Sequence, residues 1–344
     1  MMTIGWTFGA SVQSVVAAWR EPGPRVLRRL GWTIRYWTAA LASNADPRQV
    51  AAYRTVAGIP PSRARDLLFT SDIRIWRLIN AVQQANGDDV QDKARFAAAC
   101  QRAGLPTVPV IAAFERGRPV IPTAPFEAGE GDIFIKALRV FAGDGAAVWR
   151  REGNGYRNDS QFHPTLVDLL TDAAGTDCIV QPRMRDNATL RAAGSEGLSS
   201  LRIITIMVPG NPVRVVAAVL AFARGVLSQN GDLFGVNIDD GTVITRYDRK
   251  ENRVVAFDRH DPGFVLERIE CWSEIIDLVC QGHARMLPAF ASLGWDVALS
   301  DRGMLLLEAN QGWGLVPPQL LCGPLGPGPI AATAPYWIAR LKAQ

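Results

Sequence analysis

The protein has 344 residues, of which 48% are hydrophobic and 20% charged, and its formal net charge is +4. This composition is typical of a globular chain and not of a disordered one, and the length exceeds that of one average domain, so we expect two or three packed lobes. The net charge is small for the length and the aromatic residues are not interleaved with basic runs, which argues against nucleic acid as the main partner.

Arginine greatly outnumbers lysine, because the 37 basic residues include only four lysines, Lys93, Lys136, Lys250 and Lys342. Lysine carries its charge on a compact ammonium group, whereas arginine carries it on a planar guanidinium group. A lysine retained in so arginine-rich a chain is therefore a candidate for a site that a guanidinium would not fit. Chance retention is the alternative for each of the four.

The five cysteines are scattered through mostly apolar sequence, which favours buried thiols in a reducing compartment over a disulfide framework or a zinc site. The first residues lack the charged segment and the cleavage site of a signal peptide, and no apolar run is long enough to span a bilayer. We therefore expect a cytoplasmic protein.

Residues 1 to about 90 are predicted to be helical. The segments RVLRRLGWTIRYWTAALA, residues 25–42, and SDIRIWRLINAVQQA, residues 71–85, repeat apolar residues at helical spacing, the second behind a cap at Ser71 or Asp72. This part contains 11 arginines, no lysine and six acids. A basic amphipathic helix usually turns its arginines to water, and peripheral association with a membrane is the alternative.

Helices and strands alternate from residue 92 to residue 184. The stretch DKARFAAACQRAG predicts a helix that stops at Gly104, and a short strand follows it. The next strand ends at Lys136, and a loop with Gly143, Asp144 and Gly145 leads to another strand. The helix PTLVDLLTDAAG and the strand CIVQPRM complete a part of the α+β or α/β kind.

Strands dominate the rest of the chain. SLRIITIMV and VRVVAAVLAFARG are predicted strands around a GNP turn, and GVNIDDGTVITR is a predicted hairpin. A helix from about residue 269 to residue 293 then leads to the strands GWDVALS and MLLLEAN, which DRG joins.

These last two strands place two acids and an amide together. If DRG forms a three-residue loop, Ser300 faces Met304, and counting back from each side sets Asp296 opposite Glu308. Alternation puts Asn310 on the same face, with opposed Cβ atoms about 5 Å apart. Opposed carboxylates repel each other. Protonation of one acid, a nearby arginine or a divalent cation would relieve this repulsion. We favour a Mg²⁺ ion that also bridges to phosphates. The alternative is that the two acids are solvated separately.

The loop FAGDGAA is a weaker signal. Its glycines let a ligand approach the backbone closely, so the N–H groups of Gly143, Asp144 and Gly145 could bind a phosphate. Lys136 would then neutralise part of the negative charge of that phosphate. A Gly-x-Gly between two strands is more often a plain hairpin, and this loop matches neither dinucleotide-binding nor Walker motifs.

Six motifs together resemble the ATP-grasp superfamily and, within it, the sugar-transfer-associated ATP-grasp family. They are DK at residues 92–93 ahead of GLPTVP, FIK at 134–136, CIVQP at 178–182, SLRIIT at 200–205, GWD at 294–296 and LLEAN at 306–310. The resemblance covers about residues 90 to 320 and extends to α-L-glutamate ligase-like proteins. It implies an α+β protein with an ATP-grasp fold, in which two α/β lobes clasp ATP. We then expect a helical N-terminal region at 1–90, a first nucleotide lobe at 91–182 and a C-terminal lobe with the metal site at 183–344.

The resemblance also implies which residues bind the nucleotide. Lys93 and Lys136 match the lysines that contact its phosphates, and Gln181 matches the interlobe hinge that recognises adenine. The mobile loop that closes over the phosphates matches Gly143, Asp144 and Gly145.

Arg202 matches an arginine near the γ-phosphate, so that Arg202 and Lys136 are the expected catalytic residues. The expected ligands of Mg²⁺ are Asp296, Glu308 and Asn310. One departure is that residues 1–90 read as helical where many members have an α/β domain, so the substrate contacts of that domain cannot be transferred.

The resemblance implies an ATP- and Mg²⁺-dependent ligase that joins a small-molecule carboxylate to an amine through an acylphosphate, in glycan or other envelope-associated biosynthesis. No Ser-His-Asp or Cys-His set offers a protein nucleophile. Two alternatives stay open, a kinase on the same scaffold and a non-catalytic nucleotide-binding module. The retained lysines and the acidic pair count against the module.

Overall fold

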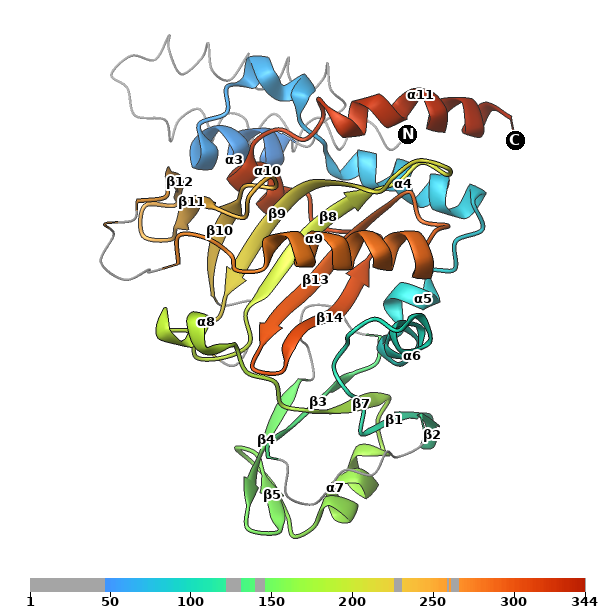
Figure 1. Ribbon diagram of the computed structural model, residues 1–344, viewed down its shortest axis with the longest axis vertical. Coiled ribbons are helices and arrows are strands. Elements are labelled where there is room, and N and C mark those ends of the chain that lie inside the picture. Colours follow the sequence, from blue (N-terminus) through green and yellow to red (C-terminus); the bar gives the residue numbers. More distant parts are fainter. Residues whose placement is uncertain are drawn as a thin grey trace.

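The computed structural model describes residues 47–121, 131–139, 146–225, 231–258, 260 and 266–343. Within these residues the strands form two antiparallel sheets, of which the first lies below the second in Figure 1. The predicted helix at residues 25–42 and the predicted loop of Gly143, Asp144 and Gly145 lie outside the described residues.

The first sheet has the strand order β2-β1-β7-β3-β4-β5-β6. Its strands are β1 (Ala112–Glu115), β2 (Arg118–Ile121), β3 (Ile133–Ala137), β4 (Ala147–Glu152), β5 (Gly155–Arg157), β6 (Phe162–His163) and β7 (Cys178–Pro182). Leu169 of the helix α7 (Leu166–Ala173) packs into a core with Trp149 and Val180 of this sheet.

The second sheet has the order β12-β11-β10-β9-β8-β13-β14. Its strands are β8 (Ser200–Ile206), β9 (Arg214–Phe222), β10 (Asp232–Val236), β11 (Val243–Asp248), β12 (Arg253–Ala256), β13 (Ser292–Ser300) and β14 (Gly303–Asn310).

Among the described residues the remaining helices are α3 (Pro47–Ala57), the 3₁₀ helix η1 (Pro61–Asp66), α4 (Thr70–Val82), α5 (Asp88–Gln91), α6 (Lys93–Ala103), α8 (Ala188–Ala192), α9 (Trp272–Gln281), the π-helical turn η3 (Gly282–Met286), α10 (Val316–Cys322) and α11 (Pro329–Lys342). No helix in this part of the chain is long and apolar enough to cross a membrane. The five cysteines are free thiols; Cys100 and Cys178 are buried, whereas Cys271 is exposed.

One face of the second sheet packs against α9 and α6. Trp295 and Val297 of β13 enter this core together with Ile275 of α9 and Phe96 of α6. Figure 1 shows α9 lying across this face. Because residues at alternate positions of a strand face opposite sides, the neighbouring side chains of β13 point to the other face.

The N-terminal helices pack on that other face, at the end of the sheet farthest from the first sheet (Figure 1). Trp76 and Ile79 of α4 share a core with Trp337 of α11. The side-chain oxygen of Asn80, also on α4, accepts a hydrogen bond of 3.0 Å from the backbone N–H of Ala291. These contacts hold α4 against the second sheet.

Gln319 of α10 fixes the segment between α3 and α4. Its side chain is fully buried. It exchanges two hydrogen bonds of 2.8 Å with the backbone of Leu68 and donates a third, of 2.7 Å, to the hydroxyl of Tyr53. The described N-terminal helices are therefore an integral part of the second lobe's packing.

The helix predicted at residues 269–293 is wrong at both ends. It starts at Trp272, becomes a π-helical turn after Gln281, and gives way to β13 at Ser292. Pro288 supplies the physical reason for the early end, because proline lacks the N–H that the next helical turn would need.

Candidate functional site

The hairpin of β13 and β14 sets Asp296 directly opposite Glu308, as predicted, but by a different route. Ser300 pairs with Gly303, so the turn contains two residues and not the predicted three. A β-bulge at Leu307 then shifts the register by one residue and restores the Asp296–Glu308 pair.

The bulge also decides which way the acids point. Leu306 and Ala309 both enter the core beneath α9, although they lie three positions apart. Leu305 instead packs with Met184 on the opposite side of the strand. Since the bulge interrupts the alternation, Glu308 emerges on the same side as Leu305, toward the first lobe.

Arg202 of β8 lies opposite Asp296 in the neighbouring strand and pairs with it. Its Nε and Nη2 atoms each donate to one carboxylate oxygen of Asp296, the second over 2.8 Å. Burial raises the pKa of Asp296 to about 6, although Arg202 opposes this rise. The charge of Glu308 across the hairpin adds to it.

Glu308 stays acidic in spite of its burial. Its Oε1 accepts a hydrogen bond of 2.9 Å from Nδ2 of Asn310. Burial by itself would raise the pKa of Glu308, but the hydrogen bonds with Asn310 and Asp296 and the charge of Lys136 hold it below its usual value. The site therefore contains an ionised carboxylate facing a cation of the first lobe.

Two lysines interact with the charge of this acid, Lys136 from β3 of the first sheet and Lys93 from α6, which packs against both sheets. Burial lowers the pKa of Lys136, on β3, to about 8; Glu308 opposes the shift and the charge of Lys93 adds to it. Burial also lowers the pKa of Lys93, at the start of α6, against the charges of Glu308 and Asp92. The Nζ atom of Lys93 donates to the carbonyl of Leu138 over 3.4 Å.

A cavity of about 150 Å³ lies between the two sheets next to Lys136. Its apolar walls come from both lobes and comprise Val108, Phe134, Val148, Pro182, Met184, Leu198 and Leu307. Gln181, buried at the end of β7, lines the cavity and donates its amide N–H to the carbonyl of Val108 over 3.4 Å. Lys136 and Arg183 add positive charge to the lining, and the apolar walls with the amide of Gln181 suit a planar heterocycle.

The oxygen donors of Asp296, Glu308 and Asn310 fit a hard cation such as Mg²⁺, which prefers carboxylate and carbonyl oxygens. Each carboxylate oxygen offers two acceptor positions, so Asp296 keeps acceptor capacity beside Arg202. Within the described part of the chain no group of three or more His, Cys, Asp or Glu residues could hold a metal. The amide oxygen of Asn310 is a further oxygen donor beside the two carboxylates.

A second cavity, of about 170 Å³, adjoins Asn310 and was not predicted. It brings Arg77 of α4 and Gln91 of α5 to Gln311, which directly follows β14. The only local signal was the polar pair Gln311 and Gly312 immediately after the LLEAN motif.

Residues 76–325, more than two thirds of the chain, match the family model described as sugar-transfer associated ATP-grasp. The chain belongs to the sugar-transfer associated ATP-grasp family. The predicted family is thereby confirmed, and the two lobes form the ATP-grasp fold that it implies. No curated protein matches this ATP-grasp chain.

Several solved structures are distantly similar to this ATP-grasp protein. D-alanyl-alanine synthetase A from Vibrio cholerae O1 biovar eltor is 12% identical with a TM-score of 0.40, over 74% of this chain and 66% of that chain. L-amino acid ligase from Bacillus licheniformis is 12% identical with a TM-score of 0.35, over 65% and 41%. N5-carboxyaminoimidazole synthetase from Staphylococcus aureus is 12% identical with a TM-score of 0.37, over 64% and 44%.

The match thus spans less than half the length of the latter two chains. At such scores the structural similarity carries no conclusion about activity. The family assignment of this ATP-grasp chain rests on its sequence.

Proposed function

We propose that the protein is an ATP- and Mg²⁺-dependent ligase that joins a small-molecule carboxylate to an amine through an acylphosphate. The observation that supports this most directly is that Lys136 of β3 and Lys93 of α6 interact with Glu308 of β14. The site has cations and oxygen ligands on opposite walls, beside a largely apolar cavity. A nucleoside triphosphate with its metal requires this combination.

The proposed roles follow the position of each residue. The cavity with Gln181 binds adenine, and Lys93 and Lys136 bind the phosphates that extend from it. Asp296, Glu308 and Asn310 hold Mg²⁺, which when bound neutralises charge on the transferring phosphoryl group. Arg202 orients Asp296 and adds positive charge near the γ-phosphate.

Two further assignments belong to the same proposal. Gly143, Asp144 and Gly145, which lie outside the described residues, bind the phosphates. The chain divides into an N-terminal region at 1–90, a first nucleotide lobe at 91–182 and a C-terminal lobe at 183–344.

The chemistry needs no protein nucleophile. A carboxylate oxygen of the acid attacks the γ-phosphorus, the bond from that phosphorus to the β,γ-bridging oxygen breaks, and ADP leaves. The amine then attacks the acyl carbon, and phosphate leaves with the proton from the amine. Lys93 and Lys136 hold the nucleotide in line for the first step, so catalysis is mainly positioning and electrostatics.

The description of the matching family model associates the family with sugar transfer. On this ground we extend the proposal to biosynthesis of a glycan or another envelope component.

Thermal stability with and without MgADP tests the nucleotide site. A ligand present at 100 times its Kd adds about 2.7 kcal/mol to the free energy of unfolding. A shift that requires both ADP and Mg²⁺ is the expected result, and its absence at saturating nucleotide would remove the proposed function.

Hydroxylamine tests the reaction type, because it converts an acylphosphate to a hydroxamate. With ATP, Mg²⁺ and a panel of acids, the ligase should release ADP and form hydroxamate in equal amounts. A kinase acting on a hydroxyl would release ADP with sugars or alcohols and form no hydroxamate.

A further inference from the structure

The cavity next to Asn310 has the properties of an anion site. Arg77 is the only charged residue among the described residues that line it. The other polar side chains are the amides of Gln91, Asn310 and Gln311. No carboxylate lines the cavity, so an anion placed there would meet one full positive charge and several amide donors.

Arg77 has no counterion among the described residues, and its side chain is exposed. A guanidinium presents two parallel N–H groups that match a carboxylate. An exposed arginine usually faces bulk water, but this one lines a cavity and is covered on one side by backbone. A cation held this way is available to a ligand.

Gly312 brings the guanidinium close to the chain. A Cβ atom added at Gly312 would lie 3.2 Å from Nη2 of Arg77. The absence of a side chain there therefore lets Arg77 rest over the backbone, two residues past Asn310.

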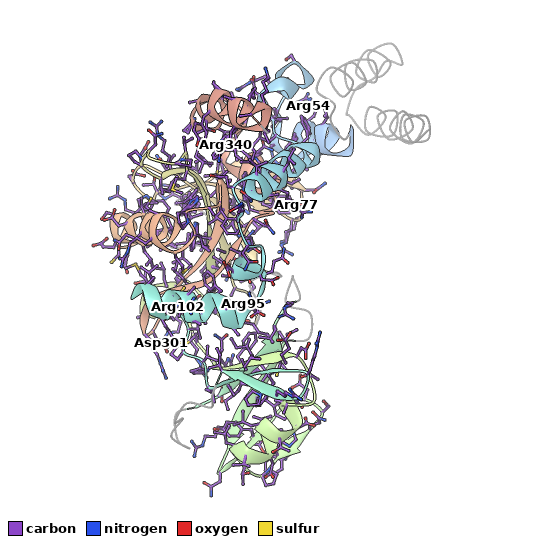
Figure 2. The ribbon with its side chains drawn as sticks, turned by 90° about the vertical axis from the view of Figure 1, so that its right-hand side faces the viewer. Arg54, Arg77, Arg95, Arg102, Asp301 and Arg340 are labelled. Atoms are coloured by element: carbon purple, nitrogen blue, oxygen red, sulfur yellow. The ribbon has the colours of Figure 1, made fainter. Side chains whose placement is uncertain are left out.

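The backbone of Arg77 is anchored although its side chain is not. The preceding residue, Trp76, and Ile79 are buried in the core with α11, and Asn80 binds the backbone at Ala291. Figure 2 shows Arg77 on α4, between Arg54 of α3 and Arg95 of α6. A fixed helix thus carries the cation to the edge of the site.

We propose that Arg77 binds the carboxylate of the acid substrate in this cavity and orients it for attack on the γ-phosphate. The inference rests on the proposed ligase function. The cavity begins at Asn310, one of the proposed Mg²⁺ ligands, so an acid held there lies next to the phosphoryl group that it must receive. At about 170 Å³ the cavity has room for the carboxylate end of the substrate.

One consequence concerns the described N-terminal helices. Besides packing against the second sheet, α4 contributes Arg77 to the substrate site.

The test measures thermal shifts of the full chain saturated with Mg²⁺ and a nonhydrolysable ATP analogue. The probes are L-alanine, L-glutamate, succinate and D-glucuronate, and the neutral amides of the same acids are the ligand controls. The variants are Arg77→Gln, Arg77→Lys and Gly312→Ala, with Arg340→Gln on the exposed side of α11 as the matched control.

We expect at least one acid, and none of the amides, to raise the melting temperature of the wild type. Arg77→Gln should weaken the apparent affinity for that acid at least tenfold while the nucleotide shift stays unchanged. Arg77→Lys should restore part of it, Gly312→Ala should weaken it less than Arg77→Gln because the guanidinium need shift only slightly, and Arg340→Gln should change nothing.

Two outcomes would overturn the inference while leaving the nucleotide site intact. One is an acid shift that survives Arg77→Gln unchanged, and the other is a nucleotide shift in the wild type with no response to any acid. Loss of the nucleotide shift in the wild type would instead remove the proposed function itself.

Discussion

Lowering the pH should destabilise the protein through one buried histidine. His283, in the π-helical turn after α9, is fully buried behind the strand that carries Asp296. Its Nε2 donates to the carbonyl of Phe290 over 2.7 Å, because a carbonyl only accepts. Because burial lowers its pKa to about 4, the ring is neutral at neutral pH, and its Nδ1 then accepts from the hydroxyl of Thr205 over 2.8 Å.

The size of the effect follows from the pKa. Burial lowers the pKa of His283 from 6.5 to about 4. The unfolded chain therefore takes up a proton first as the pH falls, so the stability present above pH 6.5 is lost as the pH falls to about 4. The difference between the two values corresponds to roughly 3 kcal/mol.

Urea unfolding followed by tryptophan fluorescence, at pH values from about 7 to about 4.5, measures this loss. The ring of Trp295 lies 6.4 Å from that of His283, so the fluorescence of Trp295 reports on the surroundings of the histidine. His283→Gln should lose less stability than the wild type over this range, whatever its stability at neutral pH. His260→Gln, at an exposed histidine, is the control and should follow the wild type. Parallel curves for the wild type and His283→Gln would refute the reasoning.

Three other variants test the site and the N-terminal helices. Glu308→Gln should abolish Mg²⁺-dependent turnover while circular dichroism stays native, because it removes a charged ligand without changing shape; unchanged turnover would exclude Glu308 from the site. Lys136→Arg should weaken MgADP binding at least tenfold in calorimetry, since a planar fork does not fit where a compact ammonium is enclosed; wild-type affinity would contradict this. Deletion of residues 1–85 should give aggregated protein, because it removes Trp76 from the core that contains Trp313; a soluble, monodisperse product in size-exclusion chromatography would show that the helices are dispensable.

Neighbouring residues alone determine where some helices start and end. Asp92 caps α6 by accepting from the N–H groups of Ala94 and Arg95, and Gly104 ends the helix in the left-handed region with φ of 66°. Of these two roles the stop at Gly104 was predicted, because a glycine after a helix acts on its immediate neighbours, whereas the cap at Asp92 was not.

The hairpin shows where such reasoning stops. The predicted opposition of Asp296 and Glu308 is correct, but the three-residue turn is wrong and the bulge at Leu307 was not foreseen; the two errors cancel. In a run of leucines no residue type marks the bulge. It forms because Leu306 and Ala309 both fill the core under α9, which only the packed sheet determines.

The sequence by itself determined the order of the motifs, the family and the kinds of atom available, two rare lysines and an oxygen-rich strand end. Only the tertiary structure decided that Lys93 and Lys136 face Glu308, and that Arg77 reaches the cavity beside it. The physical reason is that these groups belong to elements distant in the chain. Their approach depends on how the two sheets and α4 bury their apolar faces, and no local pattern encodes that.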